Sequence, residues 1–455
     1  MKKSILITVV LAMTLGLCAC SSSEKADGLQ VGFSKVNITP STPQPLGGYG
    51  DDSQRISQEI MDEISATCIA VTSGEETVLM FTVDTLNANH EDAEEYRKVI
   101  TEETGIPGEK IFIGATHCHS SPSDSGAYRT SLKQWLVDAA KGALADRSAA
   151  TMQAATPTFE KMNFVRHYKM SDGSYAGSNF GSFTAGEIVG HAVEADTQAV
   201  LVKFDRADDK KDILMVNWQA HPDMSSDIGY YNLAPSFVGP LRNKVEEETG
   251  MLVAYFTGAS GNLNPTSKII SENHNLGWRG YGEKMGELIA EATGDMQTIE
   301  GTAIRTARVM QEVSVDHSWD HMVPEANEVF MEWQNKGKAA GDLLGKQYDF
   351  SSVYQARAIR TRAGMPATQE LEMNVFSIGG IGFTTGTYEM FTESSKYVKE
   401  NSPFAVTFLI AGNSGYIPTK AAYDYRSYEA DTGYFVQGTA EMLAEKYVQM
   451  LKEIS

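Results

Sequence analysis

Residues 77–84 read TVLMFTVD, and residues 110–115 read KIFIGA. Each is an apolar run with the length of a buried β-strand. Between them, residues 90–103 have the pattern of an amphipathic helix, and Gly105 follows as a residue suited to end it. Apolar strands that alternate with a helix of this length favour a layered α/β fold with a largely buried sheet.

The same alternation continues along the chain. We expect further strands at residues 67–71, 199–204, 213–218 and 252–257, and helices at 129–146 and 236–249. Beyond residue 300, we expect one long polar-faced helix with its connections at 316–345, a polar loop region at 346–367, a strand at 372–378 and a closing helix at 433–454.

Residues 31–455 therefore predict a single catalytic domain with one inserted segment. We expect a central mixed sheet flanked by helices. In folds of this kind, functional residues lie on loops at the carboxyl ends of strands.

The charge balance excludes one class of partner. The chain has 38 Lys and Arg against 59 Asp and Glu, which gives a formal charge of −21. No block of five like charges occurs, so the acidity is spread over the surface. Such a surface repels nucleic acid and anionic membranes. We expect no nucleic-acid binding, and no protein partner is evident.

The N-terminus has the pattern of an export signal. Met1-Lys2-Lys3 is basic, residues 5–17 are apolar but too short to span a bilayer comfortably, and residues 17–20 read LCAC. This ending resembles the bacterial lipobox, in which the last cysteine, here Cys20, is diacylated. Residues 1–20 would then be a lipoprotein signal and 21–30 a flexible tether. We expect a protein exported and lipid-anchored to the bacterial cell envelope; a plain secretory signal is the alternative.

Three histidines follow predicted strands. His117 and His119 lie in GATHCHSSP at residues 114–122, and His221 lies in VNWQAHP at residues 216–222. A separation of two places both imidazoles on one side of an extended chain, with Cys118 facing away. Catalytic zinc commonly takes three protein ligands and a water. The pattern is therefore consistent with a zinc site, with capping histidines as the alternative and Cys118 as a less favoured ligand.

A serine nucleophile is a competing hypothesis. Residues 257–262 read TGASGN, in which Gly258 and Ser260 match the first part of the hydrolase elbow G-x-S-x-G. Asn262 stands where the second glycine should be. A tight structural loop explains this segment as well.

Four segments in order resemble the neutral/alkaline non-lysosomal ceramidases. They are VNITP with LGGY at residues 36–40 and 46–49, FTVDT at 81–85, THCHSSP at 116–122, and NW with HP at 217–222. The resemblance covers most of the chain that follows the signal, and it implies the catalytic-domain fold of that family. The C-terminal β-sandwich of longer ceramidases is expected to be absent.

The resemblance also implies a zinc site. The first signature histidine would be a ligand, and the acidic and tyrosine ligands match GTYEMF at residues 386–391 and GYIPT at 415–419. In the first of these, the family's Pro-Gly is replaced by Thr-Tyr. The implied Zn²⁺ ligands are His117, His221, Glu389 and Tyr416.

The implied catalytic residues surround that metal. His119 would exchange a proton with the nucleophile or the leaving amine. Tyr428 in SYE and Arg166 in NFVR match the residues that would hydrogen-bond to the developing oxyanion. The resemblance thus implies a zinc-activated water that attacks the amide carbonyl of an N-acyl (sphingo)lipid-like substrate. A lipid esterase using the same site is a near alternative, and a non-catalytic substrate-binding lipoprotein is a more distant one.

Two positions depart from the family. Residues 261–266 read GNLNPT where ceramidases have G-D-x-S-P-N, so Asn262 replaces an aspartate and Asn264 replaces a serine. These changes remove a serine-centred mechanism at this position and put ceramide itself in doubt. The zinc-water route is unaffected.

Overall fold

The computed structural model describes residues 28–49, 55–177, 187–267, 275–412 and 414–455. The predicted signal at 1–20 and most of the tether at 21–30 lie outside these residues. Within the described part of the chain, no helix is both long enough and apolar enough to cross a membrane.

A large mixed sheet forms the centre of the molecule. Its strand order is β12-β11-β10-β5-β1-β2-β3-β4, and β14 pairs with β5. The pairs β3–β4 and β11–β12 are parallel, and the other neighbours are antiparallel. The strands are β1 Leu29–Asn37, β2 Ser65–Ser73, β3 Glu76–Val83, β4 Ile111–Ala115, β5 Ser148–Ala155, β10 Val200–Arg206, β11 Ile213–Trp218, β12 Leu252–Thr257 and β14 Gln297–Thr298.

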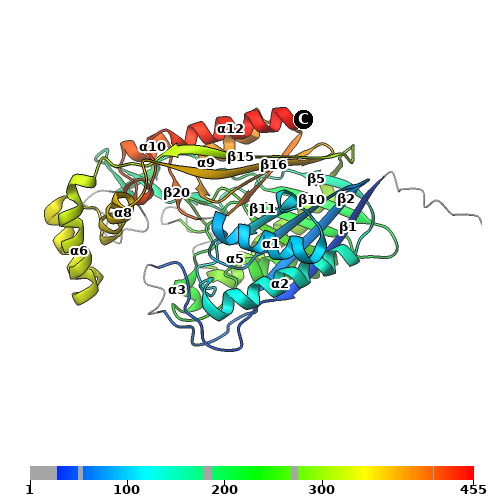
Figure 1. Ribbon diagram of the computed structural model, residues 1–455, viewed down its shortest axis with the longest axis horizontal. Coiled ribbons are helices and arrows are strands. Elements are labelled where there is room, and N and C mark those ends of the chain that lie inside the picture. The colour runs from blue at the N-terminus through cyan, green and yellow to red at the C-terminus, as the bar shows by residue number, and fades with distance from the viewer. Residues whose placement is uncertain (1–27, 50–54, 178–186, 268–274, 413) are drawn as a thin grey trace, which may run out of the picture.

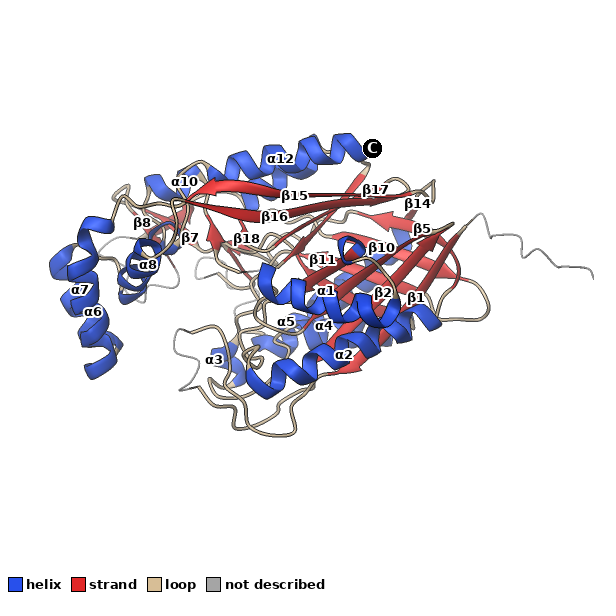
Figure 2. Cartoon of the chain, viewed as in Figure 1, coloured by secondary structure: helices blue, strands red, loops and turns tan. Residues whose placement is uncertain are grey.

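A second sheet packs face to face on the first (Figure 2). Its order is β15-β16-β17-β19, formed by Ile304–Ser314, Thr368–Ile378, Ile381–Gly386 and Val406–Ala411. Between the sheets, the rings of Phe112 and Phe376 stack at 4.0 Å and those of Phe376 and Phe383 at 4.4 Å. This buried apolar layer joins the two halves of the chain into one body.

Helices cover the outer faces of both sheets (Figure 1). The main sheet is covered by α1 His90–Thr104, α2 Gly126–Ala145, α4 Val238–Thr249 and α5 Gly277–Ala292. The second sheet is covered by α9 Thr392–Asn401 and α12 Thr439–Ile454. Gly32 allows one close approach, because a side chain there would collide with the α2 backbone at Ala143. The predicted layered α/β fold with a central mixed sheet flanked by helices is confirmed.

Short elements complete the described structure. Their strands are β6 Phe164–Val165 with β13 Leu263–Asn264, β18 Glu389–Met390 with β20 Tyr416–Ile417, and β7 His167–Met170 between β8 Tyr175–Gly177 and β9 Ile188–His191. The short helices are α3 Ser225–Ile228, α10 Lys420–Asp424 and α11 Tyr428–Thr432, with 3-10 turns at Gly108–Lys110, Thr293–Asp295, Asp320–Met322 and Lys346–Tyr348.

The inserted segment differs from the sequence prediction. The single helix expected at 316–345 is two helices, α6 Val323–Lys336 and α7 Lys338–Gly345, which Gly337 separates with a positive φ of 88°. The loop expected at 346–367 contains a third helix, α8 Val353–Ala363. Ser352 caps this helix at the Gln355 N–H. Its apolar residues pack into a small core within the insert, which stabilises a helix that is polar elsewhere.

A buried ion pair ties the main sheet to its helices. Asp84, just after β3, accepts hydrogen bonds from Arg242 of α4 at 3.0 and 2.7 Å, and from the Ser65 N–H at 2.8 Å. Both charged side chains are buried. Losing one partner would leave the other charge uncompensated in a medium that solvates it poorly.

We therefore expect Asp84→Ala to lower the free energy of unfolding by about 3–5 kcal/mol. Lys336→Ala, which removes the exposed Lys336–Glu332 pair, serves as the control and should cost less than about 1 kcal/mol. Urea denaturation followed by circular dichroism measures both. Equal shifts for the two variants would contradict this account of the ion pair.

Candidate metal centre

The loops that carry the three histidines meet where the edges of the main sheet approach each other. Thr82 Oγ1 of β3 donates to the Tyr255 carbonyl of β12, and Thr257 Oγ1 donates to the Thr116 carbonyl at 2.7 Å. The end of β4 therefore lies beside the end of β12, although these strands are the two termini of the sheet order. This curvature brings the loop after β4 to the loop after β11.

Local backbone geometry then turns the histidines inward. We predicted an extended chain at His117. This prediction is wrong, because His117 has a positive φ of 61° just after β4. The Cys118 N–H bonds to the Thr85 carbonyl at 3.1 Å, and the His221 N–H bonds to the Leu263 carbonyl at 2.9 Å. These bonds anchor both loops to neighbouring segments.

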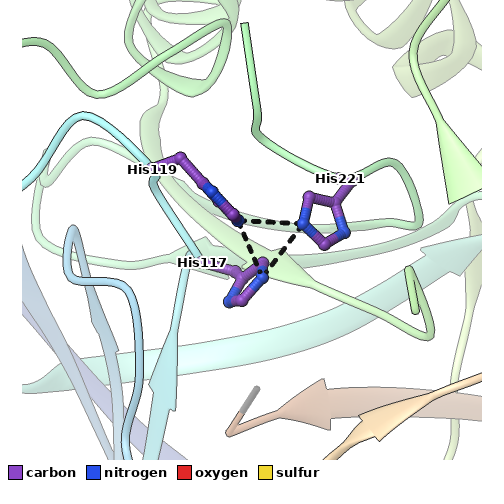
Figure 3. Close-up of side chains that lie close together, drawn as sticks. All are labelled: His117, His119 and His221. Carbon is purple, nitrogen blue, oxygen red and sulfur yellow. Dashed lines mark hydrogen bonds between the residues drawn. The ribbon is translucent and has the colours of Figure 1, made fainter. Parts of the chain in front are cut away.

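The three imidazoles converge on one point (Figure 3). The Nε2 atoms of His117 and His119 are 3.1 Å apart, as are those of His117 and His221, and those of His119 and His221 are 2.9 Å apart. All three side chains are buried. A tetrahedral metal with bonds of the usual length would place its nitrogen ligands about 3.3 Å apart, so the spacing suits a metal ion.

Hydrogen bonds fix which nitrogen carries the proton in two of the rings. His117 Nδ1 donates to the Leu86 carbonyl at 2.8 Å, and His221 Nδ1 donates to the Ser260 carbonyl at 3.3 Å. A carbonyl only accepts, so each Nε2 presents a lone pair to the centre. Burial lowers the pKa of His117 to about 4 and the pKa of both other histidines well below the usual value. Neutral imidazoles with facing lone pairs repel one another, and a bound cation would relieve this repulsion.

A buried carboxylate adjoins the imidazoles. Glu389 Oε2 lies 3.5 Å from His117 Nε2 and has no hydrogen-bond partner. Burial raises the pKa of Glu389 to about 8, while Arg166 and a hydrogen bond with Tyr416 oppose this rise. Glu389 and Tyr416 are paired residues of β18 and β20. The donor set of imidazole nitrogens and an unpartnered carboxylate oxygen fits a divalent metal. We call His117, His119, His221 and Glu389 the metal centre.

His119 differs from the other two histidines. Its Nδ1 lies 3.9 Å from Asp223 Oδ2, and a contact with the Gly48 backbone opposes the fall of the His119 pKa that burial causes. The Tyr49 ring packs edge-on against it at 5.2 Å, and the Tyr49 hydroxyl bonds to Asp223. Sequence reasoning treated His119 as a proton-transfer group, whereas the structure places its Nε2 as close to the centre as the other two.

The remaining predicted residues lie on the side of the centre next to Tyr416. The Arg166 guanidinium lies over the Tyr416 ring, 5.4 Å from its centroid, and the Tyr428 ring lies 5.9 Å from that of Tyr416. Burial raises the pKa of both tyrosines. Arg166 also forms a buried ion pair with Glu429, a residue that sequence reasoning missed. The structure thus brings together every residue that was predicted for the site.

Two alternatives from the sequence find no support. Cys118 is a buried free thiol whose Sγ contacts the Ala234 carbonyl at 3.0 Å, away from the metal centre. The Ser260 hydroxyl is buried without a hydrogen-bond partner, so no base is in place to activate it. The loop at Ser260 instead supplies the carbonyl that orients His221.

The departure at Asn262 has a structural reason. Asn262 Nδ2 donates to Glu393 Oε2 at 3.0 Å, and its Oδ1 accepts from the Thr392 N–H at 3.0 Å. The amide therefore uses both its donor and its acceptor to hold the start of α9. Asn264 lies on β13, paired with Phe164 of β6, and belongs to the scaffold around Arg166.

The fold is similar to that of known neutral ceramidase structures. The chain is similar to the neutral ceramidase from Pseudomonas aeruginosa, with a TM-score of 0.69 and 13% identity over 94% of this chain and 75% of that one. A ceramidase structure described as complexed with C2 matches with a TM-score of 0.69 and 13% identity, over 94% of this chain and 76% of that one. No protein-family model and no curated protein matches the sequence. The structural neighbours are the neutral ceramidases that the motifs resemble, and the likeness establishes a shared fold.

We expect His117→Ala to lower the bound metal from about one ion per chain to a small fraction of that value, because it removes a central nitrogen ligand. Elemental analysis after zinc loading and desalting measures the content. His317→Ala is the control, since His317 is partly exposed on the insert and pairs with Asp320. Unchanged metal in His117→Ala would contradict the assignment.

We also expect Asn262→Asp to destabilise the fold by about 1–3 kcal/mol, because Glu393 would lose a donor and face a second carboxylate. Thermal and urea denaturation measure the change. Wild-type stability in this variant would show that the amide is not needed to hold α9.

Proposed function

We propose that the chain is a zinc-dependent hydrolase that cleaves the amide bond of an N-acyl, lipid-like substrate. The observation that carries the proposal is the convergence of three buried imidazoles beside Glu389, whose Oε2 has no hydrogen-bond partner. The motif resemblance and the fold shared with neutral ceramidases supply the reaction class. Neither supplies the identity of the acyl chain or of the amine.

The proposed ligands are those implied by the sequence motifs: His117, His221, Glu389 and Tyr416. Backbone carbonyls orient His117 and His221 through Nδ1, as is usual for metal-bound histidines. Glu389 and Tyr416 approach from the paired strands β18 and β20. A bound zinc ion would polarise the substrate carbonyl and lower the pKa of a water molecule toward neutrality.

Protein side chains would supply proton transfer and stabilisation of the carbonyl oxygen. His119 is suited to move a proton, because its Nε2 faces the centre and Asp223 Oδ2 lies 3.9 Å from its Nδ1. Tyr428 and Arg166 lie next to Tyr416 and would donate hydrogen bonds to the carbonyl oxygen as it gains negative charge. Burial of His119 and Arg166 strengthens these interactions.

The proposal also includes the location of the protein. The lipobox-like LCAC at residues 17–20 supports export and lipid modification of Cys20. The enzyme would then act outside the cytoplasm while tethered to a membrane. Mass spectrometry of the mature N-terminus tests this part, because a diacylated Cys20 is expected.

The reaction is tested with a panel of fluorescent N-acyl amides and the matching esters, using protein that begins after Cys20. We expect amide cleavage that chelation abolishes and zinc restores. His119→Gln should keep about one zinc per chain and lose about 100- to 10,000-fold in kcat, because a general acid–base group is removed.

Other outcomes would change the assignment. Loss of zinc in His119→Gln would make His119 a ligand instead of a proton carrier. Cleavage confined to the esters would replace the amidase with a lipid esterase. Bound metal without turnover of either class would support the non-catalytic binding protein.

A further inference from the structure

Glu429 is a buried carboxylate close to the metal centre, and its two close partners are Arg166 and His167. Its Oε1 accepts from Arg166 Nε at 2.6 Å and lies 2.5 Å from Arg166 Nη2, and its Oε2 lies 2.7 Å from His167 Nε2. All three side chains are almost fully buried. Because water cannot replace a lost partner in this buried cluster, breaking any of its contacts would be costly, and the side chains are held in place.

The cluster joins two segments that carry predicted active-site residues. Arg166 and His167 follow β6 directly, while Glu429 lies in the first turn of α11, next to Tyr428. Ser427 caps this turn at the Ala430 N–H. Glu429 therefore links α11, which carries Tyr428, to the segment after β6, which carries Arg166.

The cluster also limits where the Arg166 guanidinium can lie. Its Nε and Nη2 atoms face Glu429, and the group lies over the Tyr416 ring. Although burial opposes it, the Glu429 carboxylate raises the pKa of Arg166, which stays charged. On the other side, His167 Nδ1 lies 2.8 Å from the Tyr425 hydroxyl, which extends the network away from the metal centre.

Glu429 remains ionised in this environment. Burial alone would raise its pKa, but His167 and Arg166 outweigh that effect and lower the pKa of Glu429 to about 2. The carboxylate is therefore a permanent anion that balances Arg166. Its hydrogen bonds and close contacts are with Arg166 and His167, and its charge adds to the effect of burial in raising the pKa of Glu389 in the metal centre.

We propose that Glu429 is a positioning residue of the hydrolytic reaction, which holds Arg166 over Tyr416 and holds Tyr428 beside it. This inference rests on the proposed function and adds to it a residue that no motif identifies. Neither Glu429 nor His167 takes part in the chemistry directly.

A second carboxylate in the same chain provides a matched control. Glu372 of β16 is fully buried, lies 2.8 Å from Arg97 and 2.6 Å from His90, and also has its pKa lowered to about 2, mainly by Arg97 acting against burial. Its interactions among the described residues involve no member of the metal centre. Glu429→Gln and Glu372→Gln therefore remove the same charge from similar surroundings.

We expect Glu429→Gln to lower kcat on the order of 100-fold with little change in KM and unchanged zinc content, because misplaced groups beside a reacting centre have effects of this size. Glu372→Gln should lose a similar amount of thermal stability and keep kcat within about twofold. Equal kcat values for the two variants, each measured per folded molecule, would overturn the proposal. If Glu429→Gln does not fold, Glu429→Asp and Glu372→Asp replace the pair with the same expectation.

A binding measurement separates this inference from the proposed function. Calorimetry with octanoate, a carboxylate of the kind that amide cleavage releases, probes the site without turnover. If the wild-type chain cleaves no amide, the proposed function fails, but weaker octanoate binding in Glu429→Gln than in Glu372→Gln would still support the positioning role. Equal binding by both variants would overturn it.

Discussion

The close approach of three buried imidazoles is the constraint on which the site depends. Two of the rings are locked by backbone carbonyls so that their Nε2 lone pairs face each other at about 3 Å, and burial removes the water that would otherwise solvate them. Maintaining such an arrangement requires a rigid scaffold. The fold supplies it by curving the main sheet until β12 approaches β3 and β4, where threonine hydroxyls bridge the two edges.

The second sheet completes this arrangement. It packs on the main sheet through stacked phenylalanines, and the chain that continues from β17 and β19 forms the short pair β18–β20. This pair delivers Glu389 and Tyr416 to the imidazoles. Arg166 and Tyr428 arrive from two further segments, which Glu429 joins. The site therefore lies where the two sheets meet. Loops of the main sheet supply the histidines, and the chain around the second sheet supplies Glu389 and Tyr416.

Sequence reasoning found the parts of the structure that have strong local signals. Strands such as β11 and β12 are mostly apolar runs, and the histidines follow strands at recognisable motifs. It did not single out β1, β5, β15, β17 or β19. Partly exposed residues weaken the apolar pattern of β5 and β15, whereas β19 is fully buried and was overlooked. It took α8 for a loop, because the polar residues of α8 obscure a helix that packing within the insert stabilises. Sequence reasoning did not identify Glu429 and His167, because a single acidic residue or a single histidine forms no motif with a recognisable spacing. Their adjacency to Tyr428 and Arg166 was the only available indication. The meeting of β4 with β12 depends on sheet curvature, which no local pattern encodes.

The most direct test of this account is X-ray absorption spectroscopy of the zinc-loaded protein. The account predicts a shell of nitrogen and oxygen ligands at about 2.0–2.1 Å, with the outer-shell scattering of imidazole rings, and loss of that signature in His117→Ala. A sulfur ligand at about 2.3 Å, or a zinc ion without imidazole scattering, would contradict the claim that these histidines hold the metal.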